Sequence, residues 1–518
     1  MARAAAAVVA GAALAAAAQQ PPGDDGDLAR RTLANAEQLL KEGKIEQALR
    51  DLDQIPRAYP RSDVADDALY RLGSYYYPAE SVEDLGRAGS DAIVRAKELF
   101  TRIQRTYPRE DSTPRALIKL GLIALESANP QRNLDEAYAS FASVVNIYPS
   151  SDMVGRALFG AGYADYAAGK YEKSILSFES VAERFAGDPV AAAARFRMGL
   201  AQARLGAWIR ALEEFQAVRT MDPNGPLAPR ALDRLTQIYK LRVLPGVGGR
   251  RLFAHDPGYA PALDPNAMRG DMSLAVGPDN TLHVLDTRSG LFLRFQHNGK
   301  LLSTGQPMPG AVAVSVDDDG VELAAAKDRL RSGVETVIPT RQDGSTMRPF
   351  QGIAAAVRVG QTDTAVLDES RNEVLQYSGD AARLKLLFRD PDGRVRLSGL
   401  AAGPEGRLYT IDKRSRTILE IAPASQGGGH KVLPMSQAAA QALQEPAALD
   451  ADDLGTLFVL DRRVRAIHVI TTDGRLLETI ASQPGGPVDF SYATAVAAGP
   501  RGEVYVYDER RKTVLRFW

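Results

Sequence analysis

Hydrophobic and polar positions follow two different periods along the chain, one in each half. From about Leu28 to Val243, apolar residues recur three to four positions apart, which predicts amphipathic helices. After the glycines that begin at Gly246, short alternating apolar runs separated by Gly and Asp predict β-strands. A chain of 518 residues is too long for one hydrophobic core. We therefore expect a helical domain over residues 28–243 and a β domain over residues 273–518, joined by residues 244–272.

The helical half contains five copies of one pattern. The first helix of each copy carries a small residue: Ala36, Gly73, Gly121, Gly162 or Gly199. The second helix carries another small residue and, four positions later, a bulky one: Leu52, Phe100, Phe141, Phe178 or Phe215. A small residue lets two helices approach closely, and a large one fills the space between adjacent pairs. In four copies a proline then ends the second helix, because it lacks an N–H and clashes with the preceding turn, and in the copy with Phe178 the proline stands later, at Pro189.

This order of small residue, alanine, aromatic residue and proline resembles the tetratricopeptide (TPR) repeat. The endings Tyr59-Pro60, Tyr107-Pro108 and Tyr148-Pro149 resemble the variety seen in envelope-assembly proteins of bacteria. The resemblance implies an α-solenoid of about five helical hairpins, with a capping helix over Ala231–Leu241. The usual TPR tryptophan is missing, and Glu80–Ser90 and Asn129–Asn133 are insertions. These departures affect the expected curvature of the array.

TPR arrays bind extended peptides along the concave face that their first helices line. Counting from the small residue of each copy, we expect this face to present Tyr70, Tyr77, Arg115, Arg156, Phe159, Tyr163, Tyr166 and Arg230. Arginines next to aromatic rings suit the capture of a peptide that carries carboxylates. The alternative is that the tyrosines pack between helices and the arginines form a solvated face.

A second repeat runs through the strand-rich half. Strands ending in Asp recur at Asp286, Asp368, Asp412, Asp461 and Asp508, each with an apolar residue nine positions later. The first step is twice as long as the others, which predicts a degenerate unit near residues 314–337. This pattern resembles the NHL repeat, which implies an all-β propeller of six blades over residues 273–518. We expect the recurrent Asp to cap the turn between the second and third strands rather than to catalyse a reaction.

The last repeat ends at Trp518 after only three strands. We expect a segment near Arg250–His255 to supply the missing outer strand, because closing the ring in this way removes an open sheet edge.

The N-terminus predicts export. Arg3 precedes an apolar run over Ala4–Ala17, and the small residues around Ala18 suit cleavage. The run is shorter than the ~20 residues that span a bilayer, and no later segment is long and apolar enough. We therefore expect a signal peptide over residues 1–18, a disordered linker over residues 19–27, and a periplasmic or secreted protein. The alternative is an alanine-rich disordered leader.

Charge and residue content narrow the classes of ligand. The 63 Lys and Arg residues against 64 Asp and Glu give a net charge of -1, which leaves no basic excess for nucleic acid. Without cysteine there are no thiol nucleophiles or thiolate metal sites. No P-loop, dinucleotide-binding or nucleophile-elbow motif is present. None of the five histidines pairs with another at metal-ligand spacing, and we expect no cofactor and no metal: His255, His283, His297, His430 and His468.

We therefore expect an exported, non-enzymatic scaffold or adaptor of the cell envelope. Its helical groove would bind a protein or peptide partner, and its propeller face a second ligand. One alternative is a propeller hydrolase or lyase with a carboxylate-bound metal, for which Asp317-Asp318-Asp319 is a candidate. Another is a glycan or cell-wall binding protein, which would require exposed aromatic residues on the propeller face.

Overall fold

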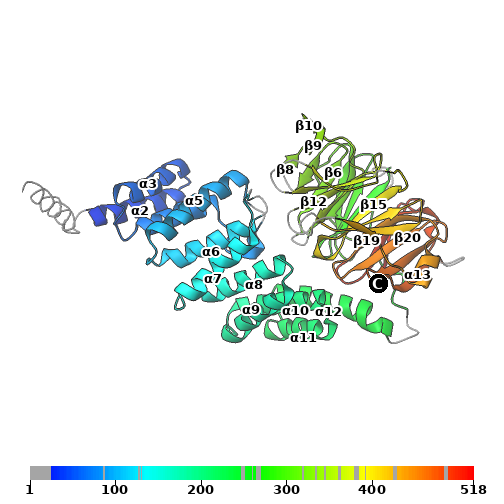
Figure 1. Cartoon of the computed structure of the whole chain (residues 1–518), viewed down its shortest axis with the longest axis horizontal. Helices are drawn as coiled ribbons and strands as arrows, with labels where there is room; N and C mark the ends of the chain where they lie inside the picture. Colours follow the sequence, from blue (N-terminus) through cyan, green and yellow to red (C-terminus); the bar gives the residue numbers. More distant parts are fainter. Residues whose placement is uncertain are drawn as a thin grey trace, which may run out of the picture.

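The computed structural model has an all-helical N-terminal part and an all-β C-terminal part (Figure 1). It describes residues 25–518 except 86–87, 127–128, 130, 247–250, 260, 264–269, 318–319, 333–334, 344–345, 360–362, 379–383, 391, 424–428 and 483–487. The predicted signal peptide and most of the linker after it lie outside the described residues. No helix among the described residues is long and apolar enough to cross a membrane.

Eleven helices stack in pairs over the described part of the N-terminal half, which confirms the predicted fold class. The pairs are α2 (Asp25–Lys41) with α3 (Ile45–Ala58), α4 (Ala65–Tyr76) with α5 (Ser90–Thr106), α6 (Ser112–Leu125) with α7 (Leu134–Ile147), α8 (Val154–Ala167) with α9 (Tyr171–Arg184), and α10 (Pro189–Arg204) with α11 (Trp208–Met221). Helix α12 (Leu227–Ile238) ends the stack and continues into η2 (Tyr239–Val243) and η3 (Leu244–Gly246).

Contacts between glycine and phenylalanine set the spacing of these pairs. A Cβ atom placed on Gly73 of α4 would lie 2.8 Å from the ring of Phe100 on α5. On Gly121 of α6 it would lie 2.6 Å from the ring of Phe141 on α7, and on Gly160 of α8 it would meet the same ring at 2.6 Å. The Phe141 ring therefore fills the space that α6, α7 and α8 share.

The first helices of the pairs form the tighter layer of the stack. Helices α4, α6, α8, α10 and α12 pack against one another in succession, whereas neighbouring second helices touch only weakly. A curved stack brings its elements closest together on its inner side, so the first helices line the concave face. Between pairs, the hydroxyl of Tyr107 donates to the carbonyl of Pro60 (2.9 Å), and that of Tyr148 to the carbonyl of Pro108 (2.7 Å).

The C-terminal half is a propeller of six antiparallel sheets with consecutive strand order, as predicted from the sequence. The blades are β1 (Met272–Val276), β2 (Leu282–Asp286), β3 (Leu291–Phe295), β4 (Leu301–Gly305); β5 (Ala311–Val316), β6 (Glu322–Ala326), β7 (Leu330–Ser332), β8 (Glu335–Val337); β11 (Ala355–Val359), β12 (Asp363–Asp368), β13 (Glu373–Ser378), β14 (Leu384–Arg389); β15 (Leu397–Ala402), β16 (Leu408–Asp412), β17 (Thr417–Ile421), β18 (His430–Val432); β19 (Pro446–Ala451), β20 (Thr456–Asp461), β21 (Ala466–Thr471), β22 (Leu476–Ala481); and β23 (Ala493–Ala498), β24 (Val504–Asp508), β25 (Thr513–Phe517).

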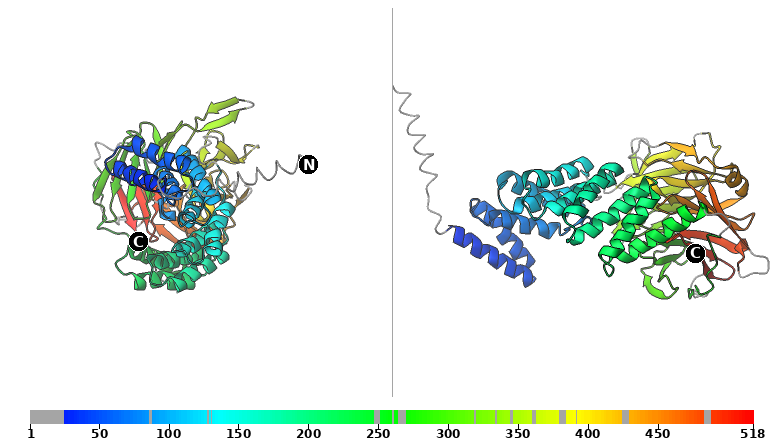
Figure 2. Two further views of the ribbon diagram at one scale, coloured as in Figure 1. Left: turned by 90° about the vertical axis from the view of Figure 1, so that its left-hand side faces the viewer. Right: turned by 90° about the horizontal axis from the view of Figure 1, so that it is seen from below.

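The first strand of each blade contacts the first strands of the blades beside it, and β1 contacts β23, so the ring is closed. A separate hairpin, β9 (Thr340–Asp343) with β10 (Thr346–Pro349), follows the second blade and projects from the ring (Figures 1 and 2). The short helix α13 (Gln437–Ala442) connects β18 to β19.

Residues 254–256 run along the outer strand of the three-stranded blade. Ala254 exchanges backbone hydrogen bonds with Trp518, each 3.0 Å long, and the N–H of Asp256 donates to the carbonyl of Arg516 at 2.9 Å. His255 forms an antiparallel bridge with Phe517. The pairing is a single bridge rather than a full strand, and it ties the segment after the helical half to the end of the chain.

Helix α12 and η2 lie against one end of the propeller (Figures 1 and 2). They contact the turns that join the first strand to the second in the blades of β19, β23 and β1. The hydrogen bonds include Arg234 to Asp453 (2.6 Å), Gln237 to Asp452 (3.2 Å), Lys240 Nζ to the carbonyl of Gly502 (2.9 Å), and Asn280 Nδ2 to Asp233 (2.8 Å). The two halves are therefore joined by a polar interface as well as by the chain.

Candidate functional site

The loop after α4 crosses the first-helix layer. Its residues 78–85, here called the acidic loop, include the short helix η1 (Val82–Asp84) and carry Glu80 and Glu83. Lys119, from the middle of α6, reaches this loop and donates through Nζ to the carbonyl of Ala79 and to Oε1 of Glu80, both at 2.6 Å. Only 1% of the Lys119 side chain is exposed, so the loop covers it.

Two arginines from the next first helices continue this contact. Arg156 of α8 places Nη1 4.0 Å from a carboxylate oxygen of Glu80. Arg197 of α10 places Nη2 3.8 Å from Oε1 of Glu83, and its guanidinium lies 4.9 Å from the ring centre of Tyr163. Lys119, Arg156 and Arg197, here called the basic strip, thus stand on three successive first helices and face the acidic loop.

A buried polar cluster holds the start of the loop. The hydroxyl of Tyr77 donates to Oε1 of Glu126 at 2.8 Å, and both residues are fully buried. Burial, and after it the Glu126 carboxylate, raise the pKa of Tyr77 far above its ordinary value. Burial lowers the pKa of the Lys119 ammonium, although its hydrogen bond to the Glu80 carboxylate acts against this shift. The loop is therefore anchored by groups that would be costly to bury without these partners.

The structure places the eight sequence-predicted residues in three environments. Tyr77, Phe159 and Tyr163 are core residues, because the helices and the acidic loop cover them. Tyr70, Tyr166 and Arg230 are half-buried and pack on Phe100, Tyr171 and Phe196 in turn. Arg115 and Arg156 are exposed on α6 and α8. Arg156 forms an ion pair with Glu80 of the acidic loop.

Sequence reasoning missed four residues of this arrangement: Lys119, Arg197, Glu80 and Glu83. A signal existed for Lys119, since it is a charged residue within the apolar stretch of α6. The two glutamates fall in a segment recognised as an insertion, and nothing in the repeat indicates where an insertion folds.

The recurrent propeller aspartates lie buried beneath turns. Each accepts hydrogen bonds from backbone N–H groups two or three residues later in the turn between the second and third strands. The donors are Arg288 for Asp286, Ser370 and Arg371 for Asp368, Arg414 and Ser415 for Asp412, Arg463 and Val464 for Asp461, and Arg511 for Asp508. Their carboxylates are thus occupied by the turns that they cap.

Among the described residues, one cluster of acidic side chains lies close enough together to hold a metal ion. Oxygens of Asp66, Asp67 and Asp111 lie within 4.8 Å of one another, on the helical half. Asp66 also accepts a hydrogen bond from Ser112 at 2.6 Å. Asp318 and Asp319 of the sequence-predicted acidic triplet lie outside the described residues.

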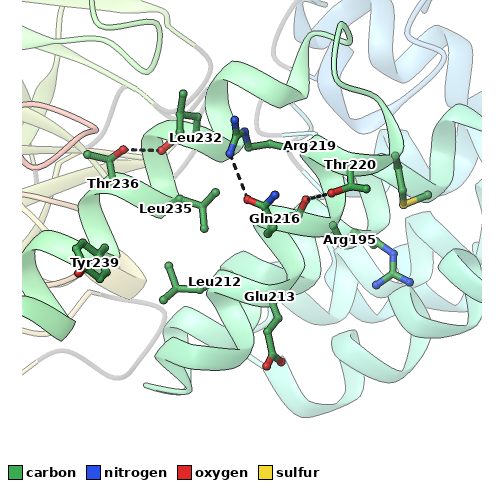
Figure 3. A pocket seen from close by; sticks show the side chains of 12 residues that line it. Arg195, Leu212, Glu213, Gln216, Arg219, Thr220, Leu232, Leu235, Thr236 and Tyr239 are labelled. Carbon is green, nitrogen blue, oxygen red and sulfur yellow. Dashed lines mark hydrogen bonds between the residues drawn. The ribbon is translucent and has the colours of Figure 1, made fainter.

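A hollow of about 900 Å³ lies between α11 and α12 on the outside of the stack (Figure 3). Leu212, Leu232, Leu235 and Tyr239 provide its apolar lining. It occupies the place where a further second helix would cover α12, and it is separate from the basic strip.

No protein-family model matches the chain, and no curated protein matches its sequence. Solved structures similar to it include a streptogramin B lyase (10% identity, TM-score 0.38, covering 51% of this chain and 97% of the lyase). A gluconolactonase from Xanthomonas campestris is 13% identical (TM-score 0.37, 51% and 98% covered). An auxiliary nutrient binding protein from Bacteroides thetaiotaomicron is 11% identical (TM-score 0.38, 51% and 72% covered). At such low identity and TM-score these likenesses carry no conclusion about activity.

Proposed function

We propose that this protein is an exported, non-catalytic adaptor whose helical half is a TPR-type array. Its concave face binds a partner segment that carries carboxylates, and its propeller face binds a second ligand. The observation that carries the proposal is the basic strip: three cations on successive first helices, all directed at carboxylates. Lys119 makes a charge-assisted hydrogen bond to Glu80, and the two arginines lie at ion-pair distance from Glu80 and Glu83. Charge-assisted contacts are the strong ones by which cations recognise acidic segments.

The acidic loop occupies the basic strip in the way that we propose for the partner segment. It presents two glutamates three residues apart, and these reach cations on α6, α8 and α10. A partner segment with the same spacing of carboxylates would meet the same side chains once the loop is displaced. Because the loop is tethered, its effective concentration is high, and it competes with any free peptide.

A labelled peptide that copies residues 78–85 tests this proposal. We expect it to bind the full-length Glu80→Ala/Glu83→Ala variant at least about ten-fold more tightly than the parent protein, because the variant's loop no longer competes for the basic strip. Binding is measured by fluorescence anisotropy.

Adding Arg156→Ala and Arg197→Ala to that variant is expected to remove most of the peptide binding. Adding instead Arg210→Ala, an exposed cation on the second helix α11, is the matched control and is expected to leave binding unchanged. Equal peptide binding by these two variants, or none by the freed variant, would contradict the proposal.

A further inference from the structure

The turns between the second and third strands gather at one end of the propeller. In an antiparallel blade this end is opposite the turns that join the first strand to the second, and those are the turns that α12 contacts. In the last three blades the turns are Lys413–Arg416, Arg462–Arg465 and Glu509–Lys512. Together they carry nine basic residues and one acidic residue, Glu509. These nine are called the basic rim.

Three residues of the basic rim adopt a left-handed backbone conformation that is unfavourable for residues with a long side chain. Arg416, Arg465 and Lys512 occupy the same position of their turns with φ of 60°, 52° and 51°. The first and third blades place Gly290 and Asn372 there, residue types that tolerate this left-handed conformation. A long L side chain costs about 1 kcal/mol at such a position. Three successive blades therefore keep a cation where glycine would fit better, which indicates a role for the charge.

Acidic neighbours reduce the charge of this end only in part. Asp412, Asp461 and Asp508 lie beneath the turns, buried and bonded to turn N–H groups. The connections that lead into the last three blades at this end add two arginines and four acidic residues: Arg394, Arg396, Asp390, Asp392, Glu445 and Asp489. The sum of charges over these three blades at this end stays positive, whereas the whole chain carries a net charge of -1.

The residues of the basic rim are arranged so that they can contact a flat surface together. Successive blades are related by rotation about the propeller axis, so equivalent turn positions lie at one height above the ring. Val464, at the tip of one turn, is 43% exposed, and Tyr492, 44% exposed, lies 5.1 Å below the guanidinium of Arg510. Cations at one level, with an apolar and an aromatic side chain among them, match the interface of a lipid bilayer.

We propose that the basic rim binds the surface of an anionic phospholipid membrane through the headgroup phosphates. This identifies the second ligand of the proposed adaptor and rests on that assignment of the propeller face. Arginine and lysine side chains near an anionic membrane each contribute about a five-fold gain in binding. The helical half, docked at the other end of the propeller, is left facing away from the membrane.

Sedimentation with vesicles tests the proposal. The full-length parent is expected to bind vesicles of phosphatidylcholine with phosphatidylglycerol, and to lose this binding when phosphatidylglycerol is left out or salt is raised. The Arg416→Gly/Arg465→Gly/Lys512→Gly variant is expected to bind roughly 100-fold more weakly. Its thermal unfolding temperature should equal or exceed that of the parent, because glycine relieves the strained conformation. Both proteins contain residues 1–24, so any contribution of that segment to vesicle binding is the same in the two measurements.

A charge-matched control removes three cations from exposed positions on the second helices, as Arg50→Gln/Lys173→Gln/Arg210→Gln. It is expected to bind vesicles as the parent does. Equal vesicle binding by the parent and the glycine variant would overturn the proposal, as would binding of soluble polyphosphate without binding of vesicles. Peptide binding by the basic strip is measured on the glycine variant that also carries Glu80→Ala/Glu83→Ala, and its retention shows that a failure concerns the membrane surface and not the helical groove.

Discussion

At the scale of single residues, glycine determines how closely the helices pack. Gly121 faces the ring of Phe141, and an added Cβ atom would lie well inside normal contact distance. Gly160 faces the same ring from the next pair. One aromatic ring therefore requires two glycines on two different helices, and a side chain at either position pushes that ring out of place.

Gly121→Ala is expected to destabilise the protein by about 1–3 kcal/mol, because the Phe141 ring is fully enclosed and must shift. Urea unfolding followed by circular dichroism measures the change. Gly26→Ala in α2 is the control, since no atom lies within 4 Å of the added Cβ, and it is expected to be neutral or slightly stabilising.

Replacing Phe141 by Leu in the Gly121→Ala protein makes room for the new methyl group. It is expected to restore part of the lost stability, although Phe141→Leu alone destabilises. A Gly121→Ala protein as stable as the parent would contradict the packing argument.

At the scale of elements, the last unit of each repeat array is covered in a different way. The helical stack ends at α12, which lacks a second helix, and one side of α12 is covered by propeller turns. The propeller has a three-stranded last blade, and residues 254–256 pair with its outer strand, β25. The end of the helical stack is therefore covered by the propeller, and the last blade of the propeller by the segment that connects the two halves.

Ala254→Pro tests the pairing along β25. Proline removes the N–H that donates to the carbonyl of Trp518, and the expected loss of stability is about 1–3 kcal/mol. Hydrogen exchange measured by mass spectrometry is expected to rise at the C-terminal peptide that ends at Trp518. Ala254→Gly keeps the N–H and should leave this protection nearly unchanged. An unaltered exchange rate in the proline variant would show that the pairing contributes little to closure.

At the scale of the whole molecule, a polar interface fixes the helical half to the propeller. Lys240 is buried within it, donating to the carbonyl of Gly502 and lying 3.8 Å from the ring centre of Phe253. Burial lowers the pKa of Lys240 to about 8, although Glu503 and Glu478 act to raise it. The folded protein thus holds a lysine whose charged form is disfavoured relative to the unfolded chain.

This shift predicts a pH dependence. Between pH 8 and the ordinary lysine pKa of about 10.4, the unfolded chain binds the proton that the folded protein has lost, so stability should rise with pH by up to about 3 kcal/mol. The comparison is between the parent and Lys240→Met, which cannot titrate. The free energy of unfolding is measured in urea at several pH values. The value for the parent minus the value for the variant should rise with pH across this window. A constant difference would contradict the assignment.

Both repeats, and with them the architecture, can be predicted from the order of residues along the chain. Each helix pair is encoded by local spacing, such as Gly73 with Phe100, and each blade by its own alternating strands and Asp-capped turn. Repeats of this kind bury their core against their neighbours, so a short stretch of sequence contains most of the information about each contact.

Tertiary structure alone decided what occupies the concave face and how the halves meet. Nothing local in residues 78–85 directs them onto Lys119 and Arg197, because those partners stand 39 and more positions away on other helices. Tyr77 and Tyr163 therefore become buried, whereas their pattern in the sequence suited an open groove equally well. The position of α12 on the propeller depends likewise on pairs such as Arg234 with Asp453, which no repeat period relates.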